Sequence, residues 1–292
     1  MPNRTTIPPL PTEFKSQIAY YDRAPDRRAE PTTYFLLHGL GNSLDFWTVV
    51  APELAKARRT VAIDIPGFGR SPAPSSGFSL GTISDAIERF CTAIGLEEAV
   101  LVAHSLGAFV AMNIAARQPS IFRRLILVDG TLTRAAELIQ HPLRIPFNPT
   151  LALYVSAQFV GGLLPINRST ANVVGRSRIM REITLWPFVA NPGALDSALV
   201  SDALADNGGL AAMRVLARAP SIDYESLMRG VSQPVDLVWG ARDHLMNEND
   251  VKVARVNMNV VRELAIADCG HWPMIEKPTE LTNFLRLADR AI

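Results

Sequence analysis

Short apolar runs alternate with helical patterns over the first 130 residues of the chain. Apolar side chains recur at helical spacing over residues 80–94, with Ser79 in the position of an N-cap, and residues 106–117 give a second helical pattern. Four short runs in the same part of the chain are mostly apolar, which is typical of strands buried on both faces. The runs cover residues 33–37, 60–65, 99–103 and 125–128. This alternation predicts a mostly parallel sheet with helices on both faces.

The pattern changes between residues 131 and 222, where helical and loop segments punctuated by proline replace the strand pattern. Strand patterns return at residues 235–239 and 261–265, and helical patterns at about 249–256 and 280–288. A segment of some ninety residues is too long and too apolar for a simple loop. We therefore predict an α/β core made of residues 1–130 and 223–292, interrupted by a helical domain at residues 131–222.

Composition and charge exclude several classes of protein. Of the 292 residues, 48% are hydrophobic and 20% are charged, which is typical of a globular chain and not of a disordered one. Lys and Arg number 29 against 28 Asp and Glu, so the basic excess of nucleic-acid-binding proteins is missing. Two cysteines, Cys91 and Cys269, are too few for a disulfide framework or a cysteine-based zinc site, and they favour a reducing compartment.

The expected location is the cytoplasm. Residues 1–12 contain four prolines and no apolar run, unlike a secretory signal. Residues 145–167 carry no charge and are long enough to span a bilayer, but proline, glycine, asparagine and glutamine interrupt them. We therefore expect no integral membrane segment and interpret this stretch as a buried or pocket-lining helix. A lid that docks on a membrane surface is the alternative.

The strongest chemical motif lies at residues 99–107, Ala-Val-Leu-Val-Ala-His-Ser-Leu-Gly. A buried strand leads directly into Ser105, and a helix follows, which is the strand–turn–helix context of a nucleophile elbow. Gly107 and Ala103 are small enough for strand and helix to approach, although Ala103 replaces the first glycine of the usual Gly-x-Ser-x-Gly. The helix N-terminus would favour negative charge developing near Ser105. The alternative interpretation is that Ser105 only caps the helix.

Three further features follow strands in a consistent order. His38-Gly39-Leu40-Gly41 comes after the first core strand, Asp243 after the strand at 235–239, and His271 after the last strand. Ser, then Asp, then His is the order of the triad in α/β-hydrolases. The roughly 28 residues from Asp243 to His271 accommodate one helix and one strand, which returns both side chains to the same edge of the sheet.

With these motifs the sequence resembles the α/β-hydrolase fold superfamily, in the branch of serine hydrolases with a helical cap domain. The resemblance runs from about Ser16 to Ala291. Residues 64–71, Asp-Ile-Pro-Gly-Phe-Gly-Arg-Ser, are similar to a structural turn of that family. The resemblance implies an α/β fold with a mostly parallel central sheet, helices on both faces, and residues 131–222 inserted as a helical cap.

The resemblance also implies roles for individual residues. Ser105 would be the nucleophile, His271 the general base, and Asp243 the acid that orients His271. The backbone amides of Leu40 and Leu106 would form the oxyanion hole. Asp129, which follows the strand at 125–128, is the alternative triad acid. No cofactor is expected, and no group of residues has the spacing of a metal site.

The substrate pocket is expected between the core and the cap. Small-molecule sites are mostly apolar, so we interpret aromatic residues of the cap and histidines near the motifs as candidate lining residues. The candidates are His38, His104, Phe109, Tyr154, Phe159, Trp186, Phe188 and Trp272. The alternative is that the aromatic residues only pack within the cap.

The charges of residues 131–222 bear on possible partners. This segment holds eight Arg, five acidic residues and no Lys, and residues 168–181 contain four Arg and no acid. A solvated helix face is the simpler interpretation. An anionic group on a small-molecule substrate, or an acidic carrier protein, is the alternative, and the oligomeric state stays open.

The sequence thus predicts a serine hydrolase that cleaves a carboxylic ester, lactone or thioester of a mostly apolar small molecule through an acyl-enzyme. A second hypothesis is a carbon–carbon bond hydrolase, because Cys269-Gly270-His271-Trp272 is similar to the histidine segment of meta-cleavage product hydrolases. A third is a non-enzymatic ligand receptor on a hydrolase fold, since a fold alone does not choose among functions.

Overall fold

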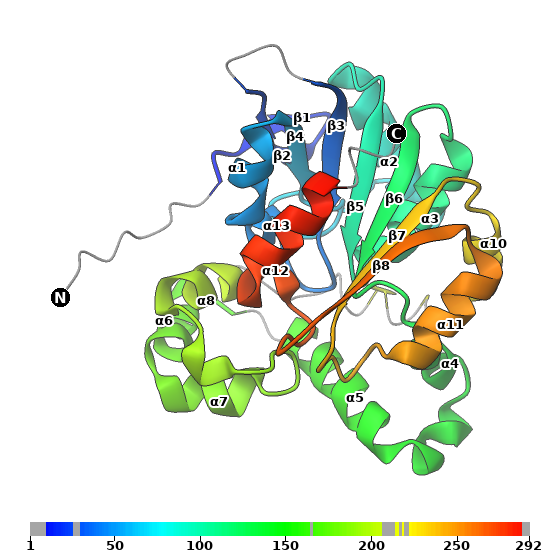
Figure 1. Cartoon of the computed structure of the whole chain (residues 1–292). Coiled ribbons are helices and arrows are strands. Elements are labelled where there is room, and N and C mark those ends of the chain that lie inside the picture. The colour runs from blue at the N-terminus through cyan, green and yellow to red at the C-terminus, as the bar shows by residue number, and fades with distance from the viewer. Residues whose placement is uncertain are drawn as a thin grey trace.

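The structure is a computed structural model that describes residues 10–25, 30–163, 166–205, 214, 215, 218 and 222–287. An eight-stranded sheet forms its centre, in the order β1-β2-β4-β3-β5-β6-β7-β8 (Figure 1). The strands are β1 (Glu13–Lys15), β2 (Ile18–Arg23), β3 (Glu30–Leu37), β4 (Arg58–Ile63), β5 (Ala99–His104), β6 (Phe122–Val128), β7 (Val235–Gly240) and β8 (Val260–Ile266). Six neighbouring strands of the sheet are mutually parallel, namely β4, β3, β5, β6, β7 and β8. The strand β2 is antiparallel to both of its neighbours, β1 and β4.

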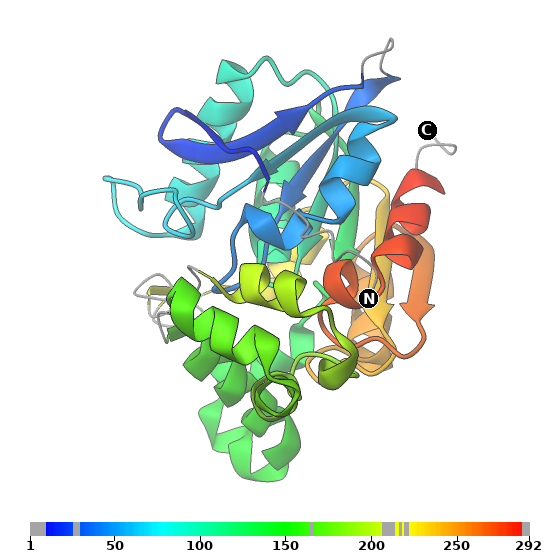
Figure 2. The ribbon, with the colours of Figure 1, turned by 90° about the vertical axis from the view of Figure 1, so that its left-hand side faces the viewer.

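Helices cover both faces of the sheet (Figures 1 and 2). Side chains alternate along each buried strand, so in β3 Phe35 and Leu37 join one apolar core while Tyr34 and Leu36 join the other. The first core is closed by α2 (Leu80–Ala93), α3 (Gly107–Arg117), α10 (Tyr224–Arg229) and α11 (Glu248–Asn257). The second is closed by η1 (Leu44–Trp47), α1 (Val50–Ala55), α12 (Pro273–Glu276) and α13 (Pro278–Leu287).

The predicted α/β fold is confirmed, and the exceptions have local causes. Ser79 caps α2 by accepting the Thr82 N–H, as expected. The strand predicted over 60–65 ends at Ile63 because Asp64 turns away to accept the backbone N–H groups of Leu44 and Arg70. The hairpin of β1 and β2 has no counterpart in the prediction, because the side chains of β1 are all exposed and give no apolar alternation.

The chain between β6 and β7 forms what we call the helical insert, the described residues from Thr131 to Ile222. It lies beyond the edge of the sheet where the parallel strands end (Figures 1 and 2). Its elements are α4 (Thr133–Gln140), η2 (Pro142–Phe147), α5 (Pro149–Leu163), α6 (Arg168–Arg176), α7 (Arg178–Leu185), η3 (Pro192–Ala194) and α8 (Ser197–Leu204). The uncharged stretch at 145–167 contains α5, and no helix among the described residues has the length and apolar character to cross a membrane.

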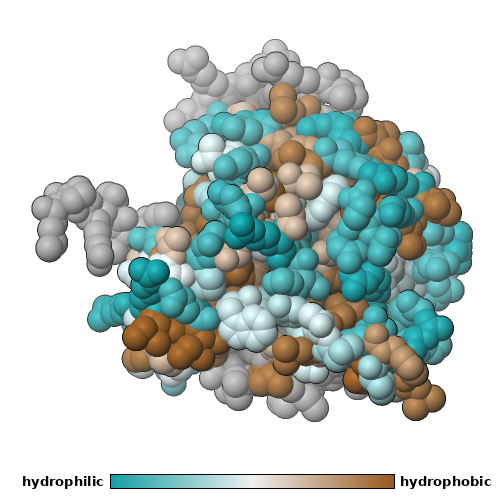
Figure 3. Space-filling view, turned by 60° about the horizontal axis from the view of Figure 1, so that its bottom comes forward, coloured by the Kyte–Doolittle hydropathy of each residue, from teal (hydrophilic) through white to brown (hydrophobic). Residues whose placement is uncertain are grey.

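Many large apolar side chains of the insert are exposed to solvent. Brown patches on the face formed by the insert are visible in Figure 3. The exposed residues of the insert are Leu143, Ile145, Phe147, Leu153, Val160, Val173, Ile179, Met180, Ile183 and Trp186. Concentrated apolar exposure of this kind commonly accompanies a binding function.

The arginine-rich segment of the insert is largely engaged within the insert itself. Arg168 contacts Asp202 and Arg178 contacts Glu182, each through a salt bridge. Arg181 is buried and donates to the carbonyl oxygens of Gly175, Pro192 and Gly193. Three of the four arginines at 168–181 therefore have partners within the insert.

Candidate active site

Ser105 stands on a sharp turn between β5 and α3. Its φ of 52° lies in the left-handed region, and its N–H donates to the Val128 carbonyl at 3.0 Å. A Cβ on Gly107 would lie 2.5 Å from the His38 carbonyl oxygen, so only glycine fits there. Ala103 is fully buried within β5 and is not among the residues with positive φ. The alanine is therefore compatible with the turn, because the strained backbone falls on Ser105.

A hydrogen-bond chain joins Ser105, His271 and Asp243. His271 Nε2 lies 2.9 Å from Ser105 Oγ, and His271 Nδ1 lies 2.7 Å from Asp243 Oδ2. A carboxylate can only accept, so Nδ1 carries the proton and Nε2 is left to accept from the Ser105 hydroxyl. All three residues are buried. These contacts fit a nucleophile, a base and an acid that orients the base.

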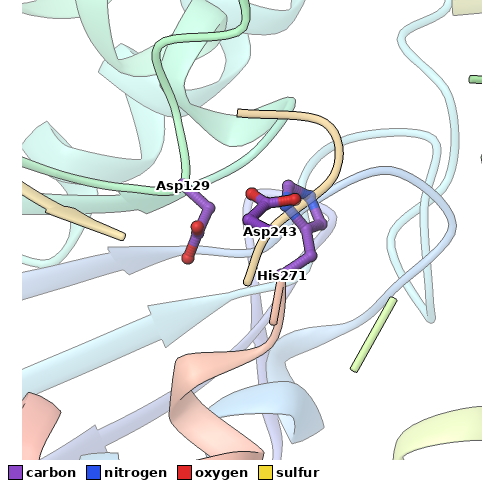
Figure 4. A group of neighbouring side chains, drawn as sticks. All are labelled: Asp129, Asp243 and His271. Atoms are coloured by element: carbon purple, nitrogen blue, oxygen red, sulfur yellow. The ribbon is translucent and has the colours of Figure 1, made fainter. Parts of the chain in front are cut away.

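Asp243 is the acid whose carboxylate contacts His271 in Figure 4. Burial raises its pKa, but the His271 ring and the hydrogen bonds from His271 and the Leu245 N–H outweigh burial and lower it overall. Asp243 is therefore expected to be ionised. In chain order it follows β7, where the sequence motif predicted it.

Asp129 approaches the same group from the loop after β6 (Figure 4). It is fully buried with a φ of 45°, and its Oδ1 accepts the Gly240 N–H at 3.0 Å. Burial, followed by the nearby charge of Asp243, raises the pKa of Asp129 well above its usual value. Two adjacent buried carboxyl groups repel each other when both are ionised, so Asp129 is the one that stays protonated.

Among the described residues, Asp129, Asp243 and His271 also form a group whose oxygen and nitrogen atoms are close enough together to suggest a metal site. Oxygen and nitrogen atoms of Asp129, Asp243 and His271 lie within 4.8 Å of one another. However, His271 uses one ring nitrogen toward Asp243 and the other toward Ser105. A metal ion bound to either nitrogen would break the hydrogen-bond chain, so the donor set fits proton transfer better than metal binding.

The loop that carries His271 is held by the helical insert. The His271 N–H donates to the Phe188 carbonyl at 2.6 Å, and a Cβ on Gly270 would lie 2.7 Å from the same oxygen. From the core side, His104 Nε2 lies 2.8 Å from the His271 carbonyl oxygen. The position of His271 thus depends on the insert as well as on the sheet.

Glu276, which the sequence analysis did not single out, ties the same loop together. Its carboxylate accepts the N–H groups of Gly270 at 2.9 Å and Ala190 at 2.7 Å. Burial raises its pKa to about 7 in spite of these hydrogen bonds. The sequence holds a weak signal for it, a carboxylate in the apolar run that follows His271.

Glu276 should make stability fall as the pH rises between about 4.5 and 7. The folded protein binds the proton more tightly than the unfolded chain, whose carboxyl titrates near 4.5, so the Glu276 contribution is present at low pH and is lost through neutrality. Glu276→Gln should remove this component, which amounts to up to about 3 kcal/mol. Urea unfolding at several pH values measures it. Glu280→Gln, an exposed neighbour, is the control, and parallel pH curves for Glu276→Gln and wild type would contradict the assignment.

The loop after β3 lies against the elbow. His38 Nδ1 faces the Gly39 carbonyl oxygen at 2.8 Å and Nε2 accepts the Ile65 N–H at 3.0 Å, and burial lowers the pKa of the ring, so His38 is neutral and fixes the loop. Leu40 and Leu106 both line a cavity that reaches Ser105. This placement is compatible with their amides serving a developing oxyanion.

The cavity at Ser105, which we call the first cavity, is lined by aliphatic side chains. It encloses about 710 Å³ of space between its walls, part of it open to solvent. Its described lining is Leu40, Ser105, Leu106, Phe109, Leu132, Ala135, Ala136, Ile139, Val155, Val215, Ile222 and Leu245. Sequence reasoning missed the contribution of α4, although Leu132, Ala135, Ala136 and Ile139 have the spacing of one helix face.

Of the predicted pocket residues, Phe109 belongs to the described lining of the first cavity, and the others make the following contacts. Tyr154 stacks on His244 with ring centroids 4.1 Å apart, and it also contacts Trp186. Phe188 stacks on Trp272 at 5.5 Å. His38 and His104 are buried behind the loop and the elbow. The side chain of Phe159 lies outside the described part of the chain.

Comparisons with known proteins agree with this architecture. Residues 35–161 match the family model of the α/β hydrolase fold. The chain is 25% identical over 273 residues to 1-acylglycerol-3-phosphate O-acyltransferase ABHD5 of Homo sapiens, covering 86% of this chain and 76% of that one. A putative lipase from Acinetobacter baumannii superimposes with a TM-score of 0.72 at 20% identity, covering 97% and 93% of the two chains. A meta-cleavage product hydrolase gives 0.66 at 17% identity, covering 95% and 96%.

Proposed function

Because the chain has the α/β-hydrolase fold, we propose that it is a serine hydrolase that cleaves a carboxylic ester, lactone or thioester of a mostly apolar small molecule. The observation that carries the proposal is the continuous hydrogen-bond chain from Asp243 through His271 to Ser105 Oγ, which ends in an apolar cavity. Hydrolase and lipase neighbours of the same fold support the reaction class.

The proposed reaction has two halves. Ser105 Oγ attacks the acyl carbon while His271 Nε2 takes the hydroxyl proton, and the amides of Leu40 and Leu106 stabilise the oxyanion. His271 then returns the proton to the leaving alcohol or thiol, leaving an acyl group on Ser105. A water molecule, deprotonated by His271, then attacks that acyl carbon. The bond between the acyl carbon and Ser105 Oγ breaks, His271 returns the proton to Oγ, and the acid is released. Asp243 stabilises the imidazolium in both halves.

The helical insert acts in this proposal as a cap over the site. Side chains of α4 and α5 meet Leu40, Leu106 and Phe109 of the core around the first cavity. Removing water from such a cavity strengthens the interactions of the oxyanion with its donors. The cytoplasm is the proposed location, on the ground that Cys91 and Cys269 are both free buried thiols.

An active-site label tests the chemistry directly. A fluorophosphonate should modify the wild-type protein once, at Ser105, because phosphorylation requires the activated hydroxyl and the oxyanion donors. Intact mass followed by peptide mapping measures the modification. Ser177→Ala, which removes a helix-cap hydroxyl of the insert, should label normally. Labelling of another serine, or no labelling of folded protein, would contradict the proposal.

Two alternatives are separated by a substrate panel. The run Cys269-Gly270-His271-Trp272 and the meta-cleavage neighbour favour a test with vinylogous 1,5-diketones, whose carbon–carbon cleavage would identify that activity. The acyltransferase relative favours adding a glycerol-based alcohol as acyl acceptor. Tight ligand binding without multiple turnover across the panel would instead support a receptor.

A further inference from the structure

A second apolar cavity lies next to the first. It encloses about 460 Å³ of space between its walls, part of it open to solvent. Its described lining is Ile65, Phe68, Phe78, Ser79, Leu80, Ile83, Leu106, Phe109, Val110, Val215, Arg218 and Ile222. This lining contains neither Ser105 nor Leu40, and Leu106, whose amide serves the oxyanion in the proposed reaction, lines both cavities. The proposed reaction therefore leaves the space of the second cavity without a role.

Four residues line both cavities and therefore form the partition between them. They are Leu106 and Phe109 of the core and Val215 and Ile222 of the insert. Phe109 lies one helical turn after the nucleophile, at the start of α3, and is the one aromatic residue of the partition. The Phe109 ring therefore borders both cavities, at a place where a chain that starts at Ser105 and fills the first cavity can contact it.

The Phe109 ring is held in place by a rigid neighbour. Its centroid lies 4.4 Å from that of Tyr224. Tyr224 is buried, donates its hydroxyl to the Gly130 carbonyl at 2.6 Å, and accepts the Leu132 N–H at 3.1 Å. Because Tyr224 is held both by packing of its ring and by hydrogen bonds of its hydroxyl, displacing the Phe109 ring that packs against it costs free energy.

We propose that Phe109 sets the length of the acyl chain that the site accepts, by closing the passage from the first cavity into the second. This inference rests on the proposed function, since it takes the acyl group of that substrate to occupy the first cavity. The substrate class is then an ester or thioester of an unbranched aliphatic acid whose chain ends at the Phe109 ring. The second cavity is reserve space that opens when the ring is removed.

The expected signature is a break in the dependence of kcat/KM on chain length. Each methylene buried in the first cavity raises kcat/KM by about fourfold, and the gain stops where the chain meets Phe109. Phe109→Ala joins the two cavities and moves the break to longer chains by at least about two carbons. Phe109→Trp fills the passage further and moves the break to shorter chains, so the two variants shift the optimum in opposite directions.

The experiment is a series of p-nitrophenyl esters with acyl chains of increasing length, measured on wild type, Phe109→Ala and Phe109→Trp. Val110→Ala enlarges the second cavity alone. It should leave the break in place when Phe109 is present and extend it further in the Phe109→Ala background. Phe109→Leu replaces Phe109→Ala if the alanine variant does not fold, and it should shift the break in the same direction.

A binding measurement separates this inference from the proposed function. Calorimetry of 2-alkanones of increasing length on Ser105→Ala reports the cavities without turnover. Ester hydrolysis with a break that is the same in all Phe109 variants would overturn the inference and leave the function standing. Absence of hydrolysis together with a shifted break in alkanone binding would overturn the function and support the partition. An unchanged break in both measurements overturns the inference.

Discussion

Replacing Ser105 with alanine is expected to lower kcat/KM by at least about 10⁴-fold while the protein stays folded. The variant removes the hydroxyl that lies 2.9 Å from His271 Nε2 and that forms the acyl-enzyme in the proposed reaction. Initial rates on the best ester of the panel, with thermal unfolding on the same samples, measure both effects. Activity within tenfold of wild type would refute the role of Ser105.

A glycine at position 105 separates the chemical contribution of the serine hydroxyl from the cost in stability of a side chain at this backbone conformation. Ser105 has a φ of 52°, which costs free energy for any residue with a Cβ. Ser105→Gly should therefore be as inactive as Ser105→Ala but more stable than it by about 1 kcal/mol. Urea unfolding gives the difference. An equal or lower stability for the glycine variant would show that the elbow stores no strain.

The two aspartates near His271 should respond very differently to the same substitution. Asp243→Asn keeps the shape but can donate to His271 Nδ1, which favours the wrong tautomer, so kcat should fall by about 10⁴-fold. Asp129→Asn replaces a group that is already neutral by an amide of the same shape, so kcat should stay within about tenfold of wild type. Steady-state kinetics of both variants measure the contrast.

The reverse result is equally informative. A large loss in Asp129→Asn with a small loss in Asp243→Asn would make Asp129 the functional acid, which is the alternative that the sequence left open. Equal losses would indicate that the pair acts as one unit with a shared proton, and the double variant would then lose little more than either single one. Thermal unfolding of each variant serves as the control, because both side chains are fully buried within the fold.

The fold, and the way it brings Ser105, Asp243 and His271 together, could be predicted from the sequence because the signals are local. The strand that ends at His104, the turn at Ser105 and the helix that begins at Gly107 follow one another directly, and this context predicted the sharp turn. The order of Asp243 and His271 after successive strands then places them at the same sheet edge, since parallel strands share one direction.

The pocket was much less accessible, because it is made by packing between distant segments. The sequence does not show which rings the aromatic residues contact: Tyr154 stacks on His244 and Phe188 stacks on Trp272, each from a distant part of the chain. Apart from Ser105 and Phe109, the described wall of the first cavity consists of leucine, valine, isoleucine and alanine, which are also the common residues of protein cores. The importance of Glu276 could not be predicted for the same reason. Its carboxylate accepts the N–H groups of Ala190 and Gly270, which lie near it only in the folded chain.

The hydrogen bond from the His271 N–H to the Phe188 carbonyl limits how the protein can be re-engineered. One way to change the substrate specificity of such a protein is to replace its helical insert by that of a relative. In this protein, residues 188–190 of the insert help to hold the His271 loop, through the Phe188 carbonyl and through the Ala190 N–H, which donates to Glu276. A chimera that takes residues 185–190 and α12 from the same parent keeps these hydrogen bonds. A chimera that takes them from different parents is expected to lose them, and His271 would then be displaced.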